Sequence, residues 1–170
     1  GQGVPWGSIY TLEGWPWDDL YAGTSSGVFH GDGQDWTPVP NSPGSIDHMV
    51  VLETGELIVT DRLKIFRHDA SGWAEIRNIL EEEDPEGVDA LWAFTPNDVL
   101  SGDFDGVSRF DGVSWKRIDD QPCHDLFAFS PTDIFALGPY ALRHSDGGPF
   151  QRVGPVLPGY FFQVTGTSPD

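Results

Sequence analysis

Short runs of apolar or alternating residues recur along the chain, and Gly, Pro, Asn and Asp residues separate them. Alternation over a few residues between such turn signals is typical of β-strands. No segment of useful length has the 3.6-residue apolar period of an amphipathic helix. The pattern therefore predicts an all-β chain. The expected strands contain residues 9–12, 20–22, 28 and 36–39, then 49–52, 57–59, 65 and 73–76, then 91–94, 99–101, 107 and 115–118, and finally 126–129, 134–137, 142 and 150–153.

A turn that begins with Asp and is followed four residues later by an aromatic residue recurs in each set of four strands. The turn residues and their aromatics are Asp32 and Trp36, Asp69 and Trp73, Asp111 and Trp115, and Asp146 and Phe150. Seventeen residues before each aromatic stands another acid, at Asp19, Glu56, Asp98 and Asp133. The aromatics lie 37, 42 and 35 residues apart. Self-similarity at such a period indicates a repeat architecture.

Four short strands per repeat predict a β-propeller-type array of four-stranded antiparallel blades, because one such sheet cannot bury both of its faces alone. A sandwich and a solenoid are the competing interpretations, and the four-strand period disfavours both. The expected blades cover residues 8–44, 45–88, 89–123 and 124–158, and residues 159–170 start a fifth repeat whose first strand is 160–164. Four blades and an extra strand predict a partial ring, or one that a second copy completes as a homodimer.

The turn Asp and the aromatic each have an expected structural role in this fold. The Asp side chain can accept backbone N–H groups within its turn, and a Gly after it tolerates a positive φ. The aromatic side chains at the start of the fourth strands are expected to be buried between neighbouring blades.

Two segments of the third repeat resemble a bacterial propeller repeat that is abundant in large surface and secreted proteins of myxobacteria. Residues 95–102 read TPNDVLSG and residues 111–115 read DGVSW, and residues 130–138 and 167–170 repeat the first motif. The second repeat departs from it, because residues 53–56 lack the Pro. The resemblance implies a propeller scaffold, a secreted or cell-surface location, and a non-catalytic binding or interaction role whose ligand it does not identify.

Charge narrows the range of partners. Nine Lys and Arg against 27 Asp and Glu give a formal net charge of −18. Such a field repels phosphate backbones and anionic membrane surfaces, so nucleic acid is not an expected partner. No apolar run reaches the ~18 residues of a spanning helix, so no membrane insertion is expected. The expected partner is a protein or a glycan.

No nucleophile motif, phosphate loop, paired-cysteine metal site or dinucleotide fingerprint occurs in the sequence, so an enzyme is not expected. Cys123 stands alone and is interpreted as a small buried side chain. Two alternatives stay open beside the binding scaffold: a carbohydrate-binding lectin module, and a fragment of a propeller hydrolase or lyase.

Three groups of residues are candidates for ligand binding. The residues that enter the first strands are expected at the mouth of a central channel and could weakly hold a divalent cation or a cationic ligand: Asp47, His48, Asp89, His124 and Asp125. Trp15 and Trp17, beside carboxylates, could stack on a sugar. Asp103 and Asp105 are weak metal candidates in a loop too short for a calcium site. No cofactor is expected apart from the weakly bound cation.

Two charged features have simpler interpretations. A basic side chain stands two residues before each turn Asp and is expected to pair with an acid of the second strand or of a neighbouring blade. These side chains are His30, Arg67, Arg109 and His144. The acidic run at residues 81–86 is interpreted as a solvated loop, with partner or calcium docking as the alternative.

Overall fold

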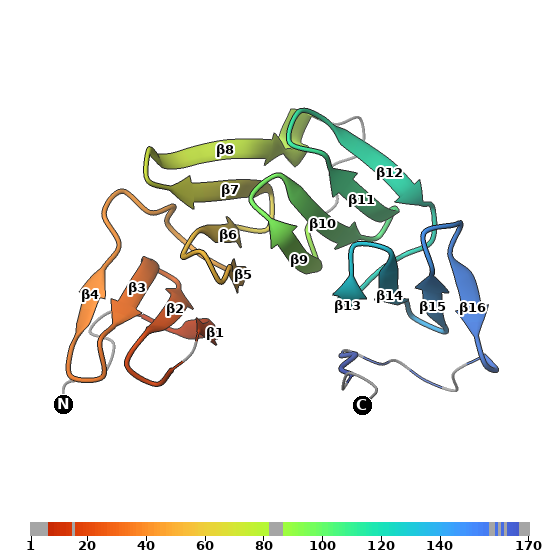
Figure 1. Ribbon diagram of the computed structural model, residues 1–170, viewed down its shortest axis with the longest axis horizontal. Helices are drawn as coiled ribbons and strands as arrows, with labels where there is room; N and C mark the ends of the chain where they lie inside the picture. Colours follow the sequence, from red (N-terminus) through yellow and green to blue (C-terminus); the bar gives the residue numbers. More distant parts are fainter. Residues whose placement is uncertain are drawn as a thin grey trace. The chain divides into compact units, whose positions relative to one another are not determined.

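The computed structural model describes residues 7–14, 16–81, 87–156, 159, 161 and 163–166, and it shows four antiparallel sheets (Figure 1). The first contains β1 (Ile9–Gly14), β2 (Leu20–Thr24), β3 (Gly27–Gly31) and β4 (Trp36–Pro38). The second contains β5 (His48–Val51), β6 (Leu57–Thr60), β7 (Lys64–Asp69) and β8 (Gly72–Asn78), which the 3-10 turn η1 (Ile79–Glu81) follows. The third contains β9 (Ala90–Thr95), β10 (Asp98–Asp103), β11 (Gly106–Phe110) and β12 (Trp115–Asp119). The fourth contains β13 (Asp125–Ser130), β14 (Asp133–Leu137), β15 (Leu142–Ser145) and β16 (Gln151–Val153).

The all-β prediction is confirmed, and the expected runs coincide with these strands. Within each sheet the strands pair in sequence order, so every sheet is an up-and-down meander joined by short turns. In the described part of the chain, η1 is the only helical segment. The acidic run begins in η1 at Glu81, and its residues 82–86 lie outside the described residues.

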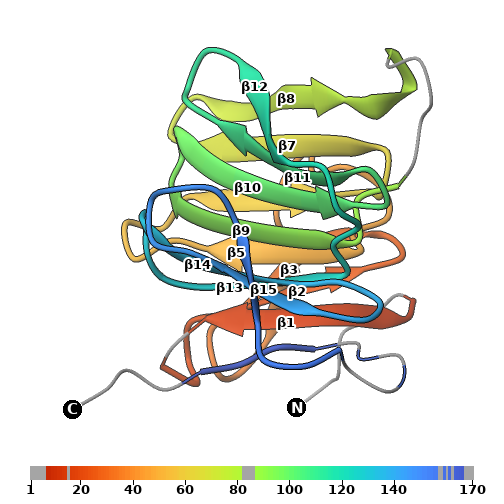
Figure 2. The ribbon, with the colours of Figure 1, turned by 90° about the vertical axis from the view of Figure 1, so that its right-hand side faces the viewer.

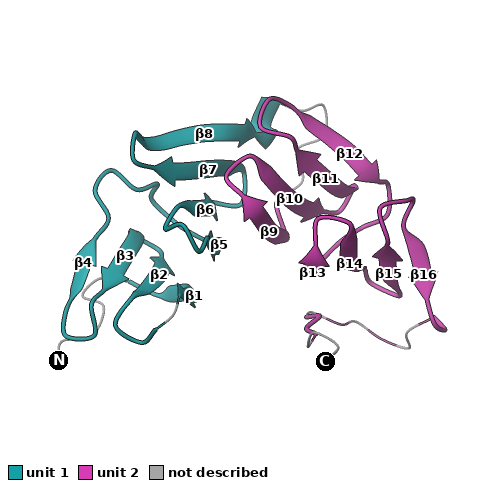
Figure 3. Ribbon diagram, viewed as in Figure 1, with its two compact units in different colours: residues 1–85 teal, residues 86–170 magenta. Residues whose placement is uncertain are grey.

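The chain divides into two compact units, Gly1–Pro85 and Glu86–Asp170, and each unit contains two of the four sheets (Figure 3). Within unit 2, the sheet β9–β12 lies over the sheet β13–β16 (Figure 2). The core of unit 1 includes Val28, Ile46, Met49, Leu57 and Val59. The core of unit 2 includes Ala90, Leu100, Val107, Cys123, Leu126, Ala128, Ile134 and Ala136. Each core therefore draws on two neighbouring sheets, which is how a propeller blade buries its faces.

The Asp side chains of the turns between third and fourth strands bind the backbone of their own turn. Asp111 Oδ1 accepts the N–H groups of Val113 and Ser114 at 2.9 and 2.8 Å. Asp32 Oδ1 accepts two backbone N–H groups in the same way, and Asp69 Oδ1 accepts one. These backbone hydrogen bonds lower the pKa of Asp32 and of Asp111, because they stabilise the ionised carboxylate.

The fourth blade closes this turn differently. There the N–H of Gly147 donates to Ser145 Oγ at 3.3 Å, and Ser145 Oγ itself donates to the carbonyl of Gly148. Gly147 has a φ of 95°, in the left-handed region that favours glycine. The Asp at the start of this turn, Asp146, is exposed.

The aromatic residues that open the outer strands differ from expectation, because they are half-buried and not buried. These residues are Trp36, Trp73, Trp115 and Phe150. The reason is their place: the fourth strand is the outer edge of its sheet, where solvent reaches the ring. Trp115 stacks on its cross-strand partner Phe110 with 5.3 Å between ring centroids. Trp73 also reaches the neighbouring sheet's connection, where its Nε1 donates to the carbonyl of Pro40 at 3.0 Å.

The segment expected to start a fifth repeat lies beside β13. Residues 160 and 162 are outside the described residues, and no strand is assigned to 161 or to 163–166. The N–H of Val164 donates to Asp125 Oδ2 at 2.6 Å. A Cβ added at Gly166 would come within 2.6 Å of the Phe127 ring, so this segment is in contact with β13.

Candidate functional site

Two aromatic side chains of unit 2 are exposed in equivalent turns, between the second and third strands of their blades. Phe104 lies between β10 and β11 and is 57% exposed, and Tyr140 lies between β14 and β15 and is 54% exposed. Both line a pocket of about 560 Å³, which we call the aromatic pocket. Its lining residues are Phe104, Gln121, Pro122, His124, Gly138, Pro139, Tyr140, Ala141 and Arg143.

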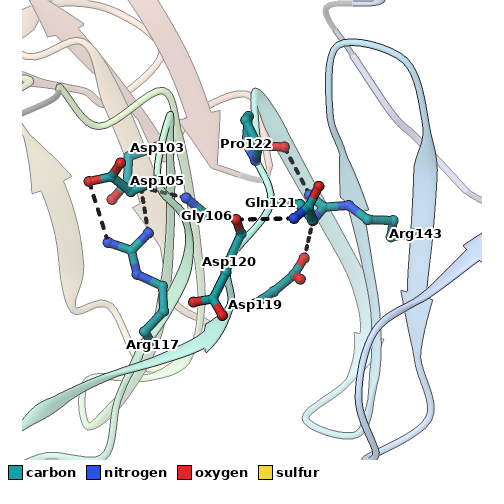
Figure 4. Close-up of polar contacts among 9 residues, drawn as sticks. All are labelled: Asp103, Asp105, Gly106, Arg117, Asp119, Asp120, Gln121, Pro122 and Arg143. Atoms are coloured by element: carbon teal, nitrogen blue, oxygen red, sulfur yellow. Dashed lines mark hydrogen bonds and ion pairs between the residues drawn. The ribbon is translucent and has the colours of Figure 1, made fainter.

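The turn that carries Phe104 is fixed by an ion pair between Asp103, which precedes Phe104, and Arg117 of β12 (Figure 4). The buried Asp103 carboxylate accepts the N–H of Gly106 at 2.9 Å and lies 3.1 Å from Arg117 Nη1. Asp105 lies 3.9 Å from the same guanidinium. The two weak metal candidates therefore have a protein cation between them, and their polar contacts leave Phe104 at the exposed tip of the turn.

The connection between β12 and β13 contributes Gln121, Pro122 and His124 to the lining of the pocket, and Arg143 of β15 holds it in place. The guanidinium of Arg143 forms an ion pair with Asp119 and donates to the carbonyl of Pro122 at 2.9 Å (Figure 4). Arg143 is 6% exposed. Burial raises the pKa of Asp119, and the neighbouring Arg143 opposes that shift. The Arg143–Asp119 pair joins the end of β12 in the third blade to β15 in the fourth blade.

Cys123 ties the same connection to the Phe104 turn through its backbone. Its N–H donates to the carbonyl of Asp103 at 2.8 Å, and its side chain is fully buried in the unit 2 core. Burial raises the pKa of the thiol to about 12, so the thiol stays protonated at neutral pH. The arrangement fits the structural role expected for Cys123.

Hydrogen-bond donors and acids lie around the apolar lining. Gln121, His124, Tyr140 and Arg143 each carry a side-chain group that can donate a hydrogen bond. His124 Nδ1 lies 3.5 Å from Asp89 Oδ2. The Asp89 side chain is 40% exposed and that of Asp105 is 48% exposed, so the surroundings of the pocket are acidic and hydrated.

Within unit 2 the structure brings together two of the residues expected at a channel mouth, Asp89 and His124. The carboxylate of Asp125 instead accepts the backbone N–H of Val164. Asp47 and His48 lie in unit 1, both half-buried, at the entry to β5. Among the described residues, no group of three or more His, Cys, Asp or Glu side chains could hold a metal ion.

Three of the four basic residues before the turn Asp residues contact the acids at the start of the second strands. Arg109 holds Asp98 with two hydrogen bonds of 2.7 Å. The His30–Asp19 and His144–Asp133 pairs have distances of 2.8 and 2.7 Å. Arg67, at the equivalent position, forms a 3.4 Å ion pair with Asp69 of its own strand β7, and this contact departs from the expected pairing. The other three contacts join second and third strands within a blade, and none of these residues lines the aromatic pocket.

Of the two tryptophans considered for sugar stacking, the structure describes only Trp17, and Trp15 lies outside the described residues. Trp17 is 66% exposed. Its ring covers the turn at Gly33, where an added Cβ would come within 2.3 Å of the indole. A separate pocket of about 360 Å³ in unit 1 lies near Glu13, Asp19, Tyr21 and Glu53, and burial raises the pKa of Glu13 there.

Phe104 and Tyr140 were not among the residues expected to bind a ligand. Both occupy short turns, where sequence patterns say little about how a side chain is used. The signal was present in the repeat itself: the unit 1 residues at the same turn positions are Ser25 and Leu63, so an aromatic residue there departs from the repeat.

Comparison with solved structures assigns the fold to the β-propeller class. A structure of streptogramin B lyase matches with a TM-score of 0.69 and 12% identity over 89% of this chain and 56% of the lyase. YCF48 bound to a D1 peptide matches with a TM-score of 0.65 and 15% identity, over 89% of this chain and 55% of YCF48. The extracellular domain of BT4673 from B. thetaiotaomicron matches with a TM-score of 0.64 and 16% identity, over 84% of this chain and 23% of that one.

These likenesses concern the fold alone, because all three sequence identities are low. The chain spans little more than half the length of the lyase and of YCF48, and 23% of the BT4673 domain. No protein-family model matches the sequence, and no curated protein does. The neighbours include an extracellular sensor-type domain, a lyase and a peptide-bound protein, which shows how many functions this fold carries. Among the described residues, no helix is long and apolar enough to cross a membrane.

Proposed function

We propose that this protein is a non-catalytic binding module that uses the aromatic pocket of unit 2 to hold a peptide segment of another protein. The observation that carries the proposal is the exposure of Phe104 and Tyr140, each by more than half, on the edge of one pocket. A secreted or cell-surface location belongs to the same proposal, and the extracellular domain among the structural neighbours is consistent with it.

Exposed rings on fixed turns are suited to binding. Burying apolar surface stabilises a complex by about 25 cal/mol per Å², and aromatic side chains are enriched among residues that dominate binding energy. The Asp103–Arg117 pair holds the Phe104 turn, and the Arg143–Asp119 pair holds the β12–β13 connection, before a ligand arrives. A preformed site loses less conformational entropy on binding, so more of the contact energy remains as affinity.

The chemistry of the lining favours binding over catalysis. Most lining residues are Pro, Gly, Ala or aromatic, and the nearby Cys123 thiol is buried with a pKa raised to about 12. The size of the pocket lies within the range of about 300–1,000 Å³ that is common for ligand sites. The peptide-bound structure of YCF48 supports the proposal at the level of the fold, because it shows a propeller with a peptide ligand.

Carbohydrate binding is the second candidate, and the exposed Trp17 favours it. An indole ring beside the carboxylates of Asp18 and Asp19 offers stacking and hydrogen bonds to sugar hydroxyls. Its ring lies on the Gly33 turn in unit 1, and Trp17 does not line the unit 1 pocket. The proposal therefore places the glycan alternative on a different surface, which one experiment can separate.

The test is selection of a random peptide phage library on the immobilised 170-residue chain, with a glycan array run on the same sample. We expect enriched peptides that bind the parent chain and Trp17→Ala but not the Phe104→Ser/Tyr140→Ser variant. Peptides that bind all three proteins equally would overturn the assignment of the site. Glycan binding that Trp17→Ala abolishes, with no enriched peptide, would replace the proposal by the lectin alternative.

A further inference from the structure

The lining of the aromatic pocket also indicates what kind of peptide it takes. We infer that the ligand segment contains proline in an extended, polyproline-like conformation and carries Lys or Arg beside it. The inference rests on the proposed function, because it names the chemistry of the ligand at that same pocket.

No carboxylate in the lining of the pocket can accept the N–H groups of a ligand backbone. The side chains of Arg143 and Gln121 already donate to the carbonyls of Pro122 and Asp120. A proline has a carbonyl oxygen but no N–H, and a polyproline helix has no internal hydrogen bonds. A proline-rich segment therefore brings few N–H groups that the pocket would leave unsatisfied.

The apolar lining favours the same ligand. Besides Phe104 and Tyr140, the apolar lining consists of Pro122, Gly138, Pro139 and Ala141, and a volume of about 560 Å³ is larger than one aliphatic side chain needs. Aromatic-lined grooves bind proline-rich segments because the extended helix is already formed and loses little entropy on docking. A strand-like peptide would have to leave some of its N–H groups facing apolar rings.

Charge complementarity is the reason to expect Lys or Arg in the ligand. Asp89 and Asp105 have exposed side chains beside the pocket, Asp120 precedes the lining residue Gln121, and the whole chain has a net charge of −18. The one arginine in the lining, Arg143, already has its charge matched by Asp119. A Lys or Arg next to the proline would meet carboxylates, whereas an acidic peptide would be repelled by them.

The equivalent turns of unit 1 provide an internal control for this inference. Ser25 occupies the position of Phe104, and the half-buried Leu63 occupies the position of Tyr140. The match of the longer turns is seen in their backbone, since the N–H of Asp61 donates to the carbonyl of Lys64 as that of Gly138 does to Ala141. Unit 1 has the same framework without the two exposed rings.

The experiment measures fluorescence anisotropy of labelled synthetic peptides with the full chain. The first peptide has three prolines and two lysines, the second replaces the prolines with alanine, and the third replaces the lysines with glutamate. Phe104→Ser/Tyr140→Ser is the site variant, and Ser25→Ala/Leu63→Ala is its matched control in unit 1. The strongest peptide from phage selection is measured beside them.

We expect the proline–lysine peptide to bind at least about tenfold more tightly than either altered peptide, which corresponds to about 1.4 kcal/mol. The site variant should lose this binding, the unit 1 control should keep it, and added salt should weaken it. If a selected peptide needs Phe104 and Tyr140 but contains neither proline nor basic residues, the inference fails while the proposed function stands. If no peptide binding depends on the two rings, both fail.

Discussion

The turns between second and third strands differ between the two units, although the strands around them are alike. In unit 1 these turns present Ser25, which is exposed, and Leu63, which is half-buried. In unit 2 the same positions present Phe104 and Tyr140, both exposed by more than half. The repeated sheet thus fixes where a turn lies, and the residue at the turn decides whether that place can bind.

The units also differ in how these turns are stabilised. In unit 1 the Asp61 carboxylate accepts the N–H groups of Leu63 and Lys64, so the turn is closed by its own residues. In unit 2 the Asp103 carboxylate also accepts a turn N–H, that of Gly106, and arginines on other strands, Arg117 and Arg143, add charge pairs to this turn and to the adjoining connection. Because these charge pairs are largely buried, we expect unit 2 to be more sensitive to the loss of one charge around its pocket.

The largest expected effect comes from removing the buried arginine of unit 2. Arg143→Met leaves Asp119 buried without its cation, and this should lower the free energy of unfolding by about 3–5 kcal/mol. Without the arginine, burial alone would raise the pKa of Asp119, so protonation would relieve the penalty as the pH falls toward about 4. Urea unfolding at neutral and acidic pH measures both effects.

Lys64→Met in unit 1 is the matched control for that prediction. Lys64 forms a 2.6 Å pair with Glu75, but the two side chains are 31% and 38% exposed, so water screens the pair. We expect a small change in stability with little pH dependence. Equal losses in the two variants would contradict the difference described between the units.

The next effect concerns the two tryptophans that open outer strands. Trp73 packs on the unit 1 core and donates to the carbonyl of Pro40, whereas Trp115 stacks on Phe110 of its own blade. Both rings are only half-buried, so neither loss should exceed about 3 kcal/mol. Trp73→Ala should lower the free energy of unfolding by about this amount because Trp73 packs on the core, and Trp115→Ala should lower it less. Trp73→Phe keeps most of the ring and removes the donor, so chemical denaturation of the three variants separates packing from hydrogen bonding. A larger loss at Trp115 would show that the third blade's outer strand carries more of the core.

A smaller effect is expected from the charge in the third blade's turn. The backbone hydrogen bonds to Asp111 lower its pKa, so its ionised form stabilises the fold above the unfolded-state pKa of about 3.9. The parent should melt at a higher temperature than Asp111→Asn at neutral pH, and the difference should disappear as the pH falls through the lowered pKa. In the fourth blade Ser145, which does not titrate there, accepts the turn N–H. Ser145→Ala should therefore lower the melting temperature equally at neutral pH and below the pKa of Asp111.

The smallest expected effect on stability comes from the pocket itself. Phe104 is 57% exposed, so Phe104→Ser should change the free energy of unfolding by no more than about 0.5 kcal/mol. Leu63 in unit 1, at the position that Tyr140 has in unit 2, is half-buried, so Leu63→Ser should cost more, about 1 kcal/mol. Thermal and urea unfolding measure the stability of both variants. If Phe104 were part of a core, Phe104→Ser would lose more stability than Leu63→Ser.

The strands and turns could be predicted from the sequence because they depend on local residue patterns that recur in each repeat. Turn residues such as Asp111 and Gly112 define where a strand ends, and short apolar runs such as Val99 and Leu100 mark strand positions that are buried. The degree of burial of Trp115 could not be read in this way. It depends on the sheet edge at which the strand lies, and therefore on the order of strands in the sheet.

The site was harder to predict because it depends on contacts between residues distant in sequence. The aromatic pocket combines Phe104 with Tyr140, one repeat further on, and its shape depends on the ion pair between Asp119 and Arg143. The distribution of charged residues predicted instead a binding site at the Asp and His residues that enter the first strands. Of these, Asp89 and His124 lie together, whereas Asp125 accepts the backbone N–H of Val164.

The central claim, that ligand binding uses the unit 2 turns and not their unit 1 counterparts, is tested most directly by amide hydrogen exchange. The full chain is measured by mass spectrometry with and without a saturating amount of the tightest phage-selected peptide. The account predicts slower exchange in the segments around residues 103–106 and 138–142, and no change around residues 24–27 and 60–64. Protection of the unit 1 turns, or of the segment around Trp17 alone, would contradict it.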